Sequence, residues 1–189
     1  MKPSIRFSLC AVFLCLAPVS FAQPAQIIIV RHAEKTADPN NRHLSEIGRQ
    51  RAQALVQFVR SQTPALFLEL PVALYATARQ EKGTGQRCQE TVQPLSKALN
   101  LPLQTAFKAE DFKLLAKEVL EKPQHRGRCV LICWTHQRTP GLIEALGIHP
   151  PPPKLEENNY DTFYVISQKD GKPELQTLRQ TFKPQATHQ

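Results

Sequence analysis

The most constraining feature of this sequence is the stretch of residues 27–35, which reads IIIVRHAEK. Its first four residues are branched and apolar, which is typical of a short strand buried on both faces. The apolar run ends abruptly at Arg31 and His32. Because ligands of open parallel sheets bind just beyond the carboxyl ends of the strands, this pair lies where chemistry is expected. A strand that simply ends in two solvent-exposed residues without a function would give the same sequence pattern, so the interpretation needs support from the rest of the chain.

A second histidine also follows an apolar strand directly. Residues 129–134 read CVLICW and lead through Thr135 into His136. An Arg can hold an oxyanion with two parallel hydrogen bonds, and an imidazole can act as a nucleophile. Two strands that each end in a histidine therefore strengthen the interpretation of residues 27–35 as part of a reaction site.

The first 22 residues have the pattern of a signal peptide. Lys2 and Arg6 form a positive start, residues 7–19 are almost wholly apolar, and residues 20–22 (SFA) offer small residues to a signal peptidase. The apolar run is shorter than the ~20 residues that a membrane-spanning helix needs. We therefore expect cleavage after residue 22, no stable membrane anchor, and a single domain over residues 23–189 that is periplasmic or secreted.

The charge balance favours an anionic partner. Without the two basic residues of the expected signal peptide, the 24 Lys and Arg fall to 22 against 16 Asp and Glu, a net charge of +6. Nucleic acid is disfavoured by the single Trp, the lack of a run of five basic residues and the export signal. A phosphorylated small molecule, glycan or protein suits the charge and the compartment better.

The remaining cysteines do not suggest a disulfide framework. Cys88, Cys129 and Cys133 are left after processing, and an odd number cannot pair completely. Cys129 and Cys133 fall on one face of the same expected strand, roughly 13 Å apart, which is too far for a disulfide bond. Cys88 could pair with either, but small buried thiols are the better expectation. Cys133 and His136 form an isolated C-x-x-H, so the sequence predicts no metal site and no cofactor.

Helices and strands alternate along the chain. Expected helices cover residues 44–62, 87–103 with a break or kink near Pro94, 111–122 and 140–146. Expected strands, besides the two above, cover residues 70–75, 160–167 and 175–182. In the first helix, Ser45 is the expected N-cap, and the expected buried face holds Ile47, Ala52, Leu55, Val56 and Val59. This alternation predicts an α/β layered domain.

Four blocks in this order resemble the histidine phosphatase superfamily. They are IIIVRHAEK, then LSEIGRQRA, then a helix beginning Arg87-x-x-x-Thr91, then the apolar strand that leads to His136. Together they span residue 27 to about residue 166. The resemblance implies a phosphoglycerate mutase-like fold, which is a three-layer αβα sandwich with a mainly parallel central sheet. It also implies phosphoryl transfer through a phosphohistidine.

By this resemblance His32 is the nucleophile, and Arg31, Arg87 and His136 form the phosphate pocket. Two guanidinium groups and an imidazole can neutralise the equatorial oxygens of a transferring phosphoryl group without a metal. The loop before Arg87 is longer than in the commonest form of the family, which makes Arg79 a competitor for its role. Only Arg87 is followed by the x-x-x-Thr pattern.

The general acid is the least defined part of the expected site. The leaving alkoxide needs a proton, which family members usually take from an Asp or Glu. In one branch the acid directly follows the second histidine, where this chain has Gln137. In the mutase-like branch a Glu lies a few tens of residues after the pocket Arg, which points to Glu110. Asp111 and Glu34 are alternatives, and Glu110 and Asp111 could equally cap the helix that follows them.

The leading hypothesis is an exported phosphatase that hydrolyses phosphomonoesters through a covalent phosphohistidine. A phosphoglycerate-type mutase is disfavoured by export and by a chain too short for long substrate-covering insertions. A non-catalytic module that binds phosphate ligands on the same fold would not need both His32 and His136.

Overall fold

A single six-stranded sheet forms the centre of the computed structural model, which describes residues 23–80 and 85–184. The expected signal peptide lies outside these residues. The strands follow the spatial order β3-β2-β4-β1-β5-β6. Four of them are mutually parallel: β1 (Gln26–Arg31), β2 (Ala73–Ala76), β3 (Leu103–Gln104) and β4 (Cys129–Trp134). Strand β5 (Thr162–Lys169) runs antiparallel to both β1 and β6 (Lys172–Arg179).

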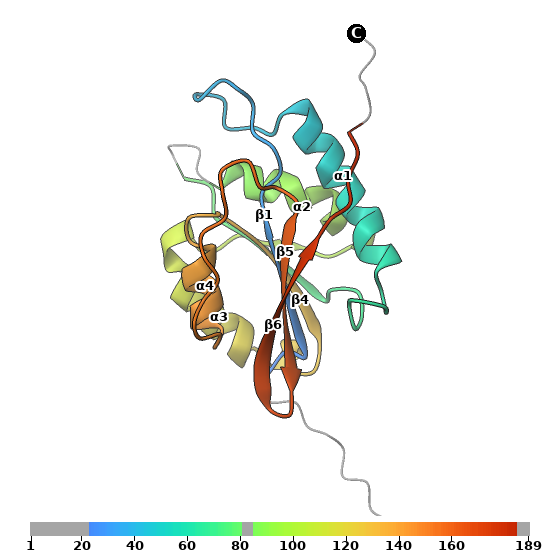
Figure 1. Cartoon of the computed structure of the whole chain (residues 1–189), viewed down its shortest axis with the longest axis vertical. Coiled ribbons are helices and arrows are strands. Elements are labelled where there is room, and N and C mark those ends of the chain that lie inside the picture. The colour runs from blue at the N-terminus through green and yellow to red at the C-terminus, as the bar shows by residue number, and fades with distance from the viewer. Residues whose placement is uncertain (1–22, 81–84, 185–189) are drawn as a thin grey trace, which may run out of the picture.

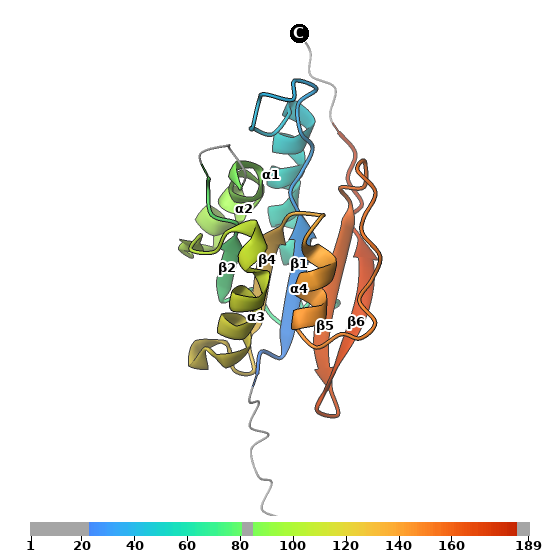
Figure 2. The ribbon, with the colours of Figure 1, turned by 90° about the vertical axis from the view of Figure 1, so that its left-hand side faces the viewer.

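Two pairs of helices cover the two faces of this sheet. Helices α1 (Glu46–Ser61) and α2 (Gln86–Leu99) pack on one face, and α3 (Phe112–Glu121) and α4 (Thr139–Ala145) on the other. Figure 1 shows α3 and α4 across the sheet from α1, and Figure 2 shows them in front of it with β5 and β6 at one edge. The predicted fold class, a three-layer αβα sandwich with a mainly parallel sheet, is confirmed.

The alternation of side chains along β1 explains why its apolar run is continuous. Ile27 and Ile29 enter the core shared with α3 and α4, whereas Ile28 and Val30 enter the core shared with α1 and α2. All six residues of β1 are buried, Arg31 included. A strand between two helical layers must be apolar on both faces, as the sequence indicated.

The predicted elements are present, with shifted ends. Ser45 is the N-cap of α1, and its side chain accepts a hydrogen bond from the Gly48 amide. The placement of Ile47 on the buried face was wrong, because this side chain is 44% exposed. The buried face of α1 is instead made by Gly48, Ala52, Leu55 and Val59, which repeat with helical periodicity.

Two further differences concern α2 and the strand that follows it. Helix α2 continues through Pro94 without a break and ends at Asn100, whose φ of 52° is left-handed. The short strand β3 after it was not predicted. Two 3₁₀ turns, Ala109–Asp111 and Pro123–His125, flank α3.

The three cysteines of the described chain, Cys88, Cys129 and Cys133, are free and buried, as expected. Over the described residues, no helix is long and apolar enough to cross a membrane.

Candidate active site

Strands β1 and β4 bring the two predicted histidines to the same edge of the sheet. The strands are hydrogen-bonded in parallel, and Arg31 at the end of β1 lies opposite Trp134 at the end of β4. His32 and His136 follow these residues, and the centres of their rings are 6.4 Å apart in an edge-to-face arrangement. They are only 8% and 5% exposed. Strand β4 returns to lie between β1 and β2, which makes this edge a point where chain order reverses and ligands of such sheets bind.

The ring of His32 is held in one orientation by the backbone. Its Nδ1 lies 2.7 Å from the Ala33 carbonyl oxygen, which can only accept, so Nδ1 carries the proton and donates. The lone pair of Nε2 is then available for attack on an electrophile. Burial, reinforced by the positive charges of Arg31 and Arg87, lowers the pKa of His32 to about 4. The imidazole is therefore neutral at ordinary pH, as a nucleophile must be.

Thr91 connects the loop after β1 to the first turns of α2. Its hydroxyl accepts from the Ala33 amide at 2.9 Å and donates to the Arg87 carbonyl at 2.7 Å. The pattern Arg-x-x-x-Thr thus has a local structural reason, because the threonine one helical turn after Arg87 links this helix to the residue next to His32.

Arg31 is held by a loop more than a hundred residues away. Its Nη1 donates to the carbonyl oxygens of Glu156, at 2.8 Å, and Asn159, at 2.9 Å. The Tyr160 ring lies against its guanidinium group, 4.3 Å from Cζ to the ring centre. Its Nε and Nη2 atoms are buried, and neither has a hydrogen-bond partner within residues 23–80 and 85–184. Burial lowers the pKa of Arg31. Two oriented donors without an acceptor, on a cation, suit an anionic ligand.

Arg87 is also oriented by backbone carbonyl groups. Its Nε donates to the His43 oxygen at 3.2 Å, and its Nη2 donates to the Asn41 oxygen at 2.6 Å. Burial and the nearby charge of Arg42 lower the pKa of Arg87. The competitor Arg79 instead donates to the Gln89 side chain at 2.9 Å.

A cavity of about 150 Å³ joins His32 to Arg87. Its other lining residues are Arg42, Gly85, Cys88, Thr135 and Gln137. Sequence reasoning missed Arg42, because an Arg in a polar loop is most often solvated. Larger cavities lie elsewhere, including one of about 860 Å³ lined by parts of α3 and α4, away from both histidines.

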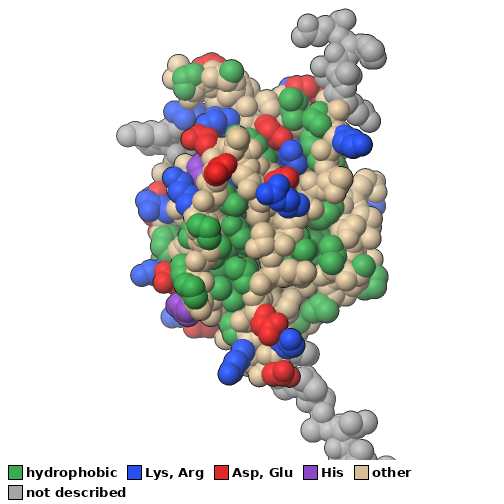
Figure 3. Space-filling view, viewed as in Figure 1, with side chains coloured by type: hydrophobic (Ala, Val, Ile, Leu, Met, Phe, Trp, Pro, Cys, Tyr) green, Lys and Arg blue, Asp and Glu red, His purple; other side chains and the backbone are tan. Residues whose placement is uncertain are grey.

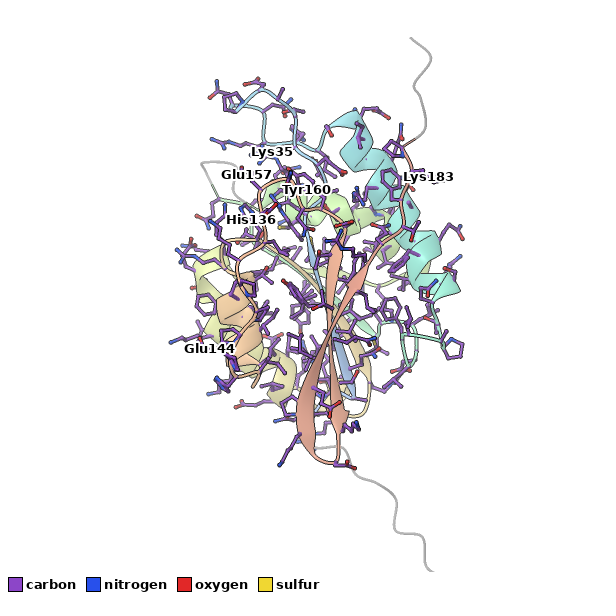
Figure 4. The ribbon with its side chains drawn as sticks, viewed as in Figure 1. Lys35, His136, Glu144, Glu157, Tyr160 and Lys183 are labelled. Atoms are coloured by element: carbon purple, nitrogen blue, oxygen red, sulfur yellow. The ribbon has the colours of Figure 1, made fainter. Side chains whose placement is uncertain are left out.

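His136 lies on the side of the site covered by the Tyr160 loop. In Figure 4 it is next to Tyr160, Glu157 and Lys35, at the end of the molecule where Figure 3 shows Lys and Arg side chains mixed with acidic ones. Burial, followed by the charges of Arg31 and Lys154, lowers the pKa of His136 to about 4. Its Nδ1 atom is buried, and no residue in the described part of the chain hydrogen-bonds to it.

The three acid candidates differ in how they are engaged. Both carboxylate oxygens of Glu34 accept from Arg51, at 2.7–3.0 Å. Asp111 accepts from the Lys108 amide at 3.0 Å and so caps its own turn. The carboxylate of Glu110 is 60% exposed and lies 3.9 Å from Arg138. The adjacent Ala109 carbonyl accepts from the Trp134 indole, which places Glu110 near the carboxyl end of β4.

Comparisons with known proteins test the fold. No protein-family model matches the chain, and no curated protein sequence does. A candidate phosphohistidine phosphatase SixA from Agrobacterium tumefaciens superposes with a TM-score of 0.51 and 17% identity, over 83% of this chain and 99% of that one. Mycobacterial glucosyl-3-phosphoglycerate phosphatase, solved with inorganic phosphate, gives 0.53 and 14%, over 81% and 95%. A candidate SixA from Nakamurella multipartitia gives 0.51 and 18%, over 82% and 95%. The chain has the phosphoglycerate mutase-like fold.

Proposed function

We propose that this chain is an exported phosphatase that hydrolyses phosphomonoesters through a phosphohistidine on His32. The observation that carries the proposal is a set of buried nitrogen atoms beside a neutral imidazole that have no hydrogen-bond partner among the described residues: Nε and Nη2 of Arg31 and Nδ1 of His136. Buried polar atoms of this kind cost free energy until a ligand joins them. The oxygens of a phosphoryl group would satisfy them and would match the positive charge of the pocket.

In the first step, the lone pair of His32 Nε2 forms a bond to phosphorus as the bond from phosphorus to the ester oxygen breaks. Arg31 and Arg87 neutralise charge on the equatorial oxygens, His136 hydrogen-bonds to one of them, and a carboxylic acid gives its proton to the departing ester oxygen. In the second step, water attacks phosphorus, the phosphorus–nitrogen bond breaks, and His32 regains its lone pair while inorganic phosphate leaves. The carboxylate left by the first step accepts the proton of the attacking water, which restores the acid.

For that proton transfer we propose Glu110. Glu34 is held by two hydrogen-bonding nitrogens of Arg51, and Asp111 accepts from a backbone amide, so each would have to leave a partner. Among the residues that the structure describes, Glu110 has one ion-pair partner, Arg138 at 3.9 Å, and its carboxylate is exposed, so a substrate can approach it. No carboxylate follows His136 directly, because Gln137 is there.

The comparisons are compatible with this activity. The proteins that share the fold are described as phosphatases acting on phosphohistidine or on glucosyl-3-phosphoglycerate. Their sequence identity of 14–18% supports the choice of fold and leaves the substrate to experiment. A phosphorylated small molecule, glycan or protein would suit the net charge of the mature chain.

Trapping the intermediate tests the proposal. A phosphoramidate is stable in base and labile in acid, so substrate labelled in the phosphoryl group and quenched in alkali should leave label on His32. His32→Ala should abolish labelling and turnover together, whereas His136→Ala should slow both by roughly 10²-fold, because a hydrogen bond to the phosphoryl oxygens is lost. The exposed His149 offers a control, and His149→Ala should behave as the unaltered protein. Normal turnover by His32→Ala would end the proposal. Phosphate binding without any turnover would favour the non-catalytic module.

A comparison of leaving groups tests the acid. An aryl oxygen scarcely needs protonation and an alkyl oxygen does, so Glu110→Gln should slow alkyl phosphates far more than aryl phosphates. Glu121→Gln, a carboxylate of α3, is the control. Equal effects on both substrates would remove Glu110 from the mechanism.

Export is tested separately. N-terminal sequencing of the protein recovered from its native host should begin at Gln23, outside the cytoplasm. A soluble cytoplasmic product that still carries residues 1–22 would contradict this part of the proposal.

A further inference from the structure

Two of the three cysteines among the described residues lie in the core next to the candidate active site. Cys88 is the third residue of α2, and Cys133 is the last but one residue of β4. Both are buried in the core between the sheet and the α1–α2 layer, and their thiols are near enough for each to shift the pKa of the other. Cys129 is buried on the same strand, four residues earlier, and its thiol contacts Gln26 instead. The described residues thus contain one pair of interacting thiols and one separate thiol of similar burial.

Of the three described cysteines, Cys88 alone lines the cavity of His32 and Arg87. This cavity, of about 150 Å³, is large enough for molecules of a few heavy atoms. A small oxidant that enters it reaches Cys88 first, and Cys133 lies behind.

The two thiols of the pair differ in acidity. The hydrogen bond from Cys133, aided by the charge of Arg31, lowers the pKa of Cys88 despite its burial. Its place in the first turn of a 14-residue helix acts in the same direction. Burial raises the pKa of Cys133 well above its ordinary value and that of Cys129 to about 12. Cys88 therefore has the character of an attacking thiolate, and Cys133 is the neighbour that can resolve its oxidised form.

We infer that Cys88 and Cys133 form an oxidation site, in which a hydroperoxide entering the His32 cavity converts the two thiols into a disulfide that joins α2 to β4. The Cys88 sulfur attacks the peroxide oxygen, the oxygen–oxygen bond breaks, and Cys88 becomes a sulfenic acid while one water is released. The Cys133 sulfur then displaces the hydroxyl group from Cys88, and a second water leaves. With hydrogen peroxide, two thiols lose two electrons and two protons, which reduce the peroxide to two waters. To form the bond, the two sulfur atoms must approach to about 2.05 Å.

Treatment of the purified mature protein with hydrogen peroxide tests the site. After blocking of remaining thiols in denaturant, mass spectrometry should find one peptide pair linked through Cys88 and Cys133, and Cys129 blocked. Reductant should restore all three thiols. Glutathione in a parallel tube verifies the oxidant. A linkage that includes Cys129, or a fully blockable protein under conditions that oxidise glutathione, would overturn the inference.

Single substitutions distinguish the thiol that attacks the peroxide from the thiol that resolves the sulfenic acid, and the readout does not depend on disulfide formation. In Cys133→Ala, Cys88 should accumulate sulfenic acid that a 1,3-diketone reagent captures. Cys88→Ala should give no adduct on Cys133, and Cys129→Ala should form the disulfide at the normal rate. Equal capture in the Cys88 and Cys133 variants would contradict the assigned order of attack.

One further measurement rests on the proposed function. Inorganic phosphate, bound as expected beside His32, should slow disulfide formation several-fold by filling the route of the oxidant. If phosphate binds by calorimetry and gives no protection, the route through the cavity is wrong. The disulfide should also form in His32→Ala, so a failure of the phosphatase proposal is distinguishable from a failure of this one.

Discussion

Acid should destabilise this protein through His32 by an amount that can be worked out. The pKa of the buried ring is about 4, against 6.5 for an exposed histidine. As the pH falls below about 6.5, His32 binds a proton in the unfolded chain and stays neutral in the folded chain. The free energy of unfolding therefore decreases until the pH reaches about 4, where the folded ring is also protonated. For these two pKa values, the contribution of His32 to the free energy of unfolding is near zero at pH 7.5 and about −3 kcal/mol at pH 4.

Urea unfolding of the unaltered protein and of His32→Asn, at pH 7.5 and pH 4, isolates this contribution. Burial also lowers the pKa values of His136 and His125, so acid reduces the free energy of unfolding through these two residues in both proteins. The difference between the two proteins in the free energy lost from pH 7.5 to pH 4 therefore reports His32. The unaltered protein should lose about 3 kcal/mol more than the variant. Equal losses, or an NMR titration of the His32 ring with a midpoint near 6.5, would refute the reasoning about its burial.

Three other outcomes are expected. Arg31→Lys keeps the charge but has three N–H donors instead of five, so it cannot bind the two carbonyls and still offer two donors to an anion. Phosphate affinity measured by calorimetry should therefore fall by roughly tenfold or more. In Gly48→Ala, the new Cβ would lie 2.3 Å from the Glu34 carbonyl oxygen, and urea unfolding should show a loss of about 1–3 kcal/mol, against a negligible change for the exposed Gln53→Ala. Hydrolysis of an aryl phosphate should survive dialysis against EDTA, since the pocket charge comes from side chains; a loss restored by zinc or magnesium would contradict this.

The fold could be predicted because its signals are local. A continuous apolar run indicates a strand buried on both faces, as β1 is. A serine before an amphipathic stretch indicates the N-terminus of a helix, and Ser45 is the N-cap of α1. The error at Ile47 has a simple cause. A helical face is fixed only to within about one residue, and the glycine at position 48, which approaches the Glu34 backbone, sets the face that turns inward.

Only the part of the candidate site that lies at the ends of strands could be predicted from the sequence. Both histidines follow strands that pair in the sheet, so their proximity follows from chain order. The carbonyl groups that orient Arg31 and Arg87 belong to loops, and the sequence carries no periodic signal for them. The position of Arg42 in the cavity could not be predicted either, because only the folded path of its loop brings this residue close to Arg87. The roles proposed for His32, His136, Arg31, Arg87 and Glu110 stay predictions, and the variants above address all of them except that of Arg87.

The contacts that residues 156–160 make with Arg31 have a consequence for the order of events during synthesis and folding. Arg31 emerges early from the ribosome, but the two carbonyls that orient it are 125 and 128 positions later. Contacts of such long sequence separation form late in folding, since the intervening chain must be closed into a loop first. A partly synthesised chain therefore has His32 without an ordered Arg31 beside it. If His32 transfers phosphoryl groups as proposed, this activity should begin only after β5 and β6 have joined the sheet, and its appearance would report that the last part of the fold is complete.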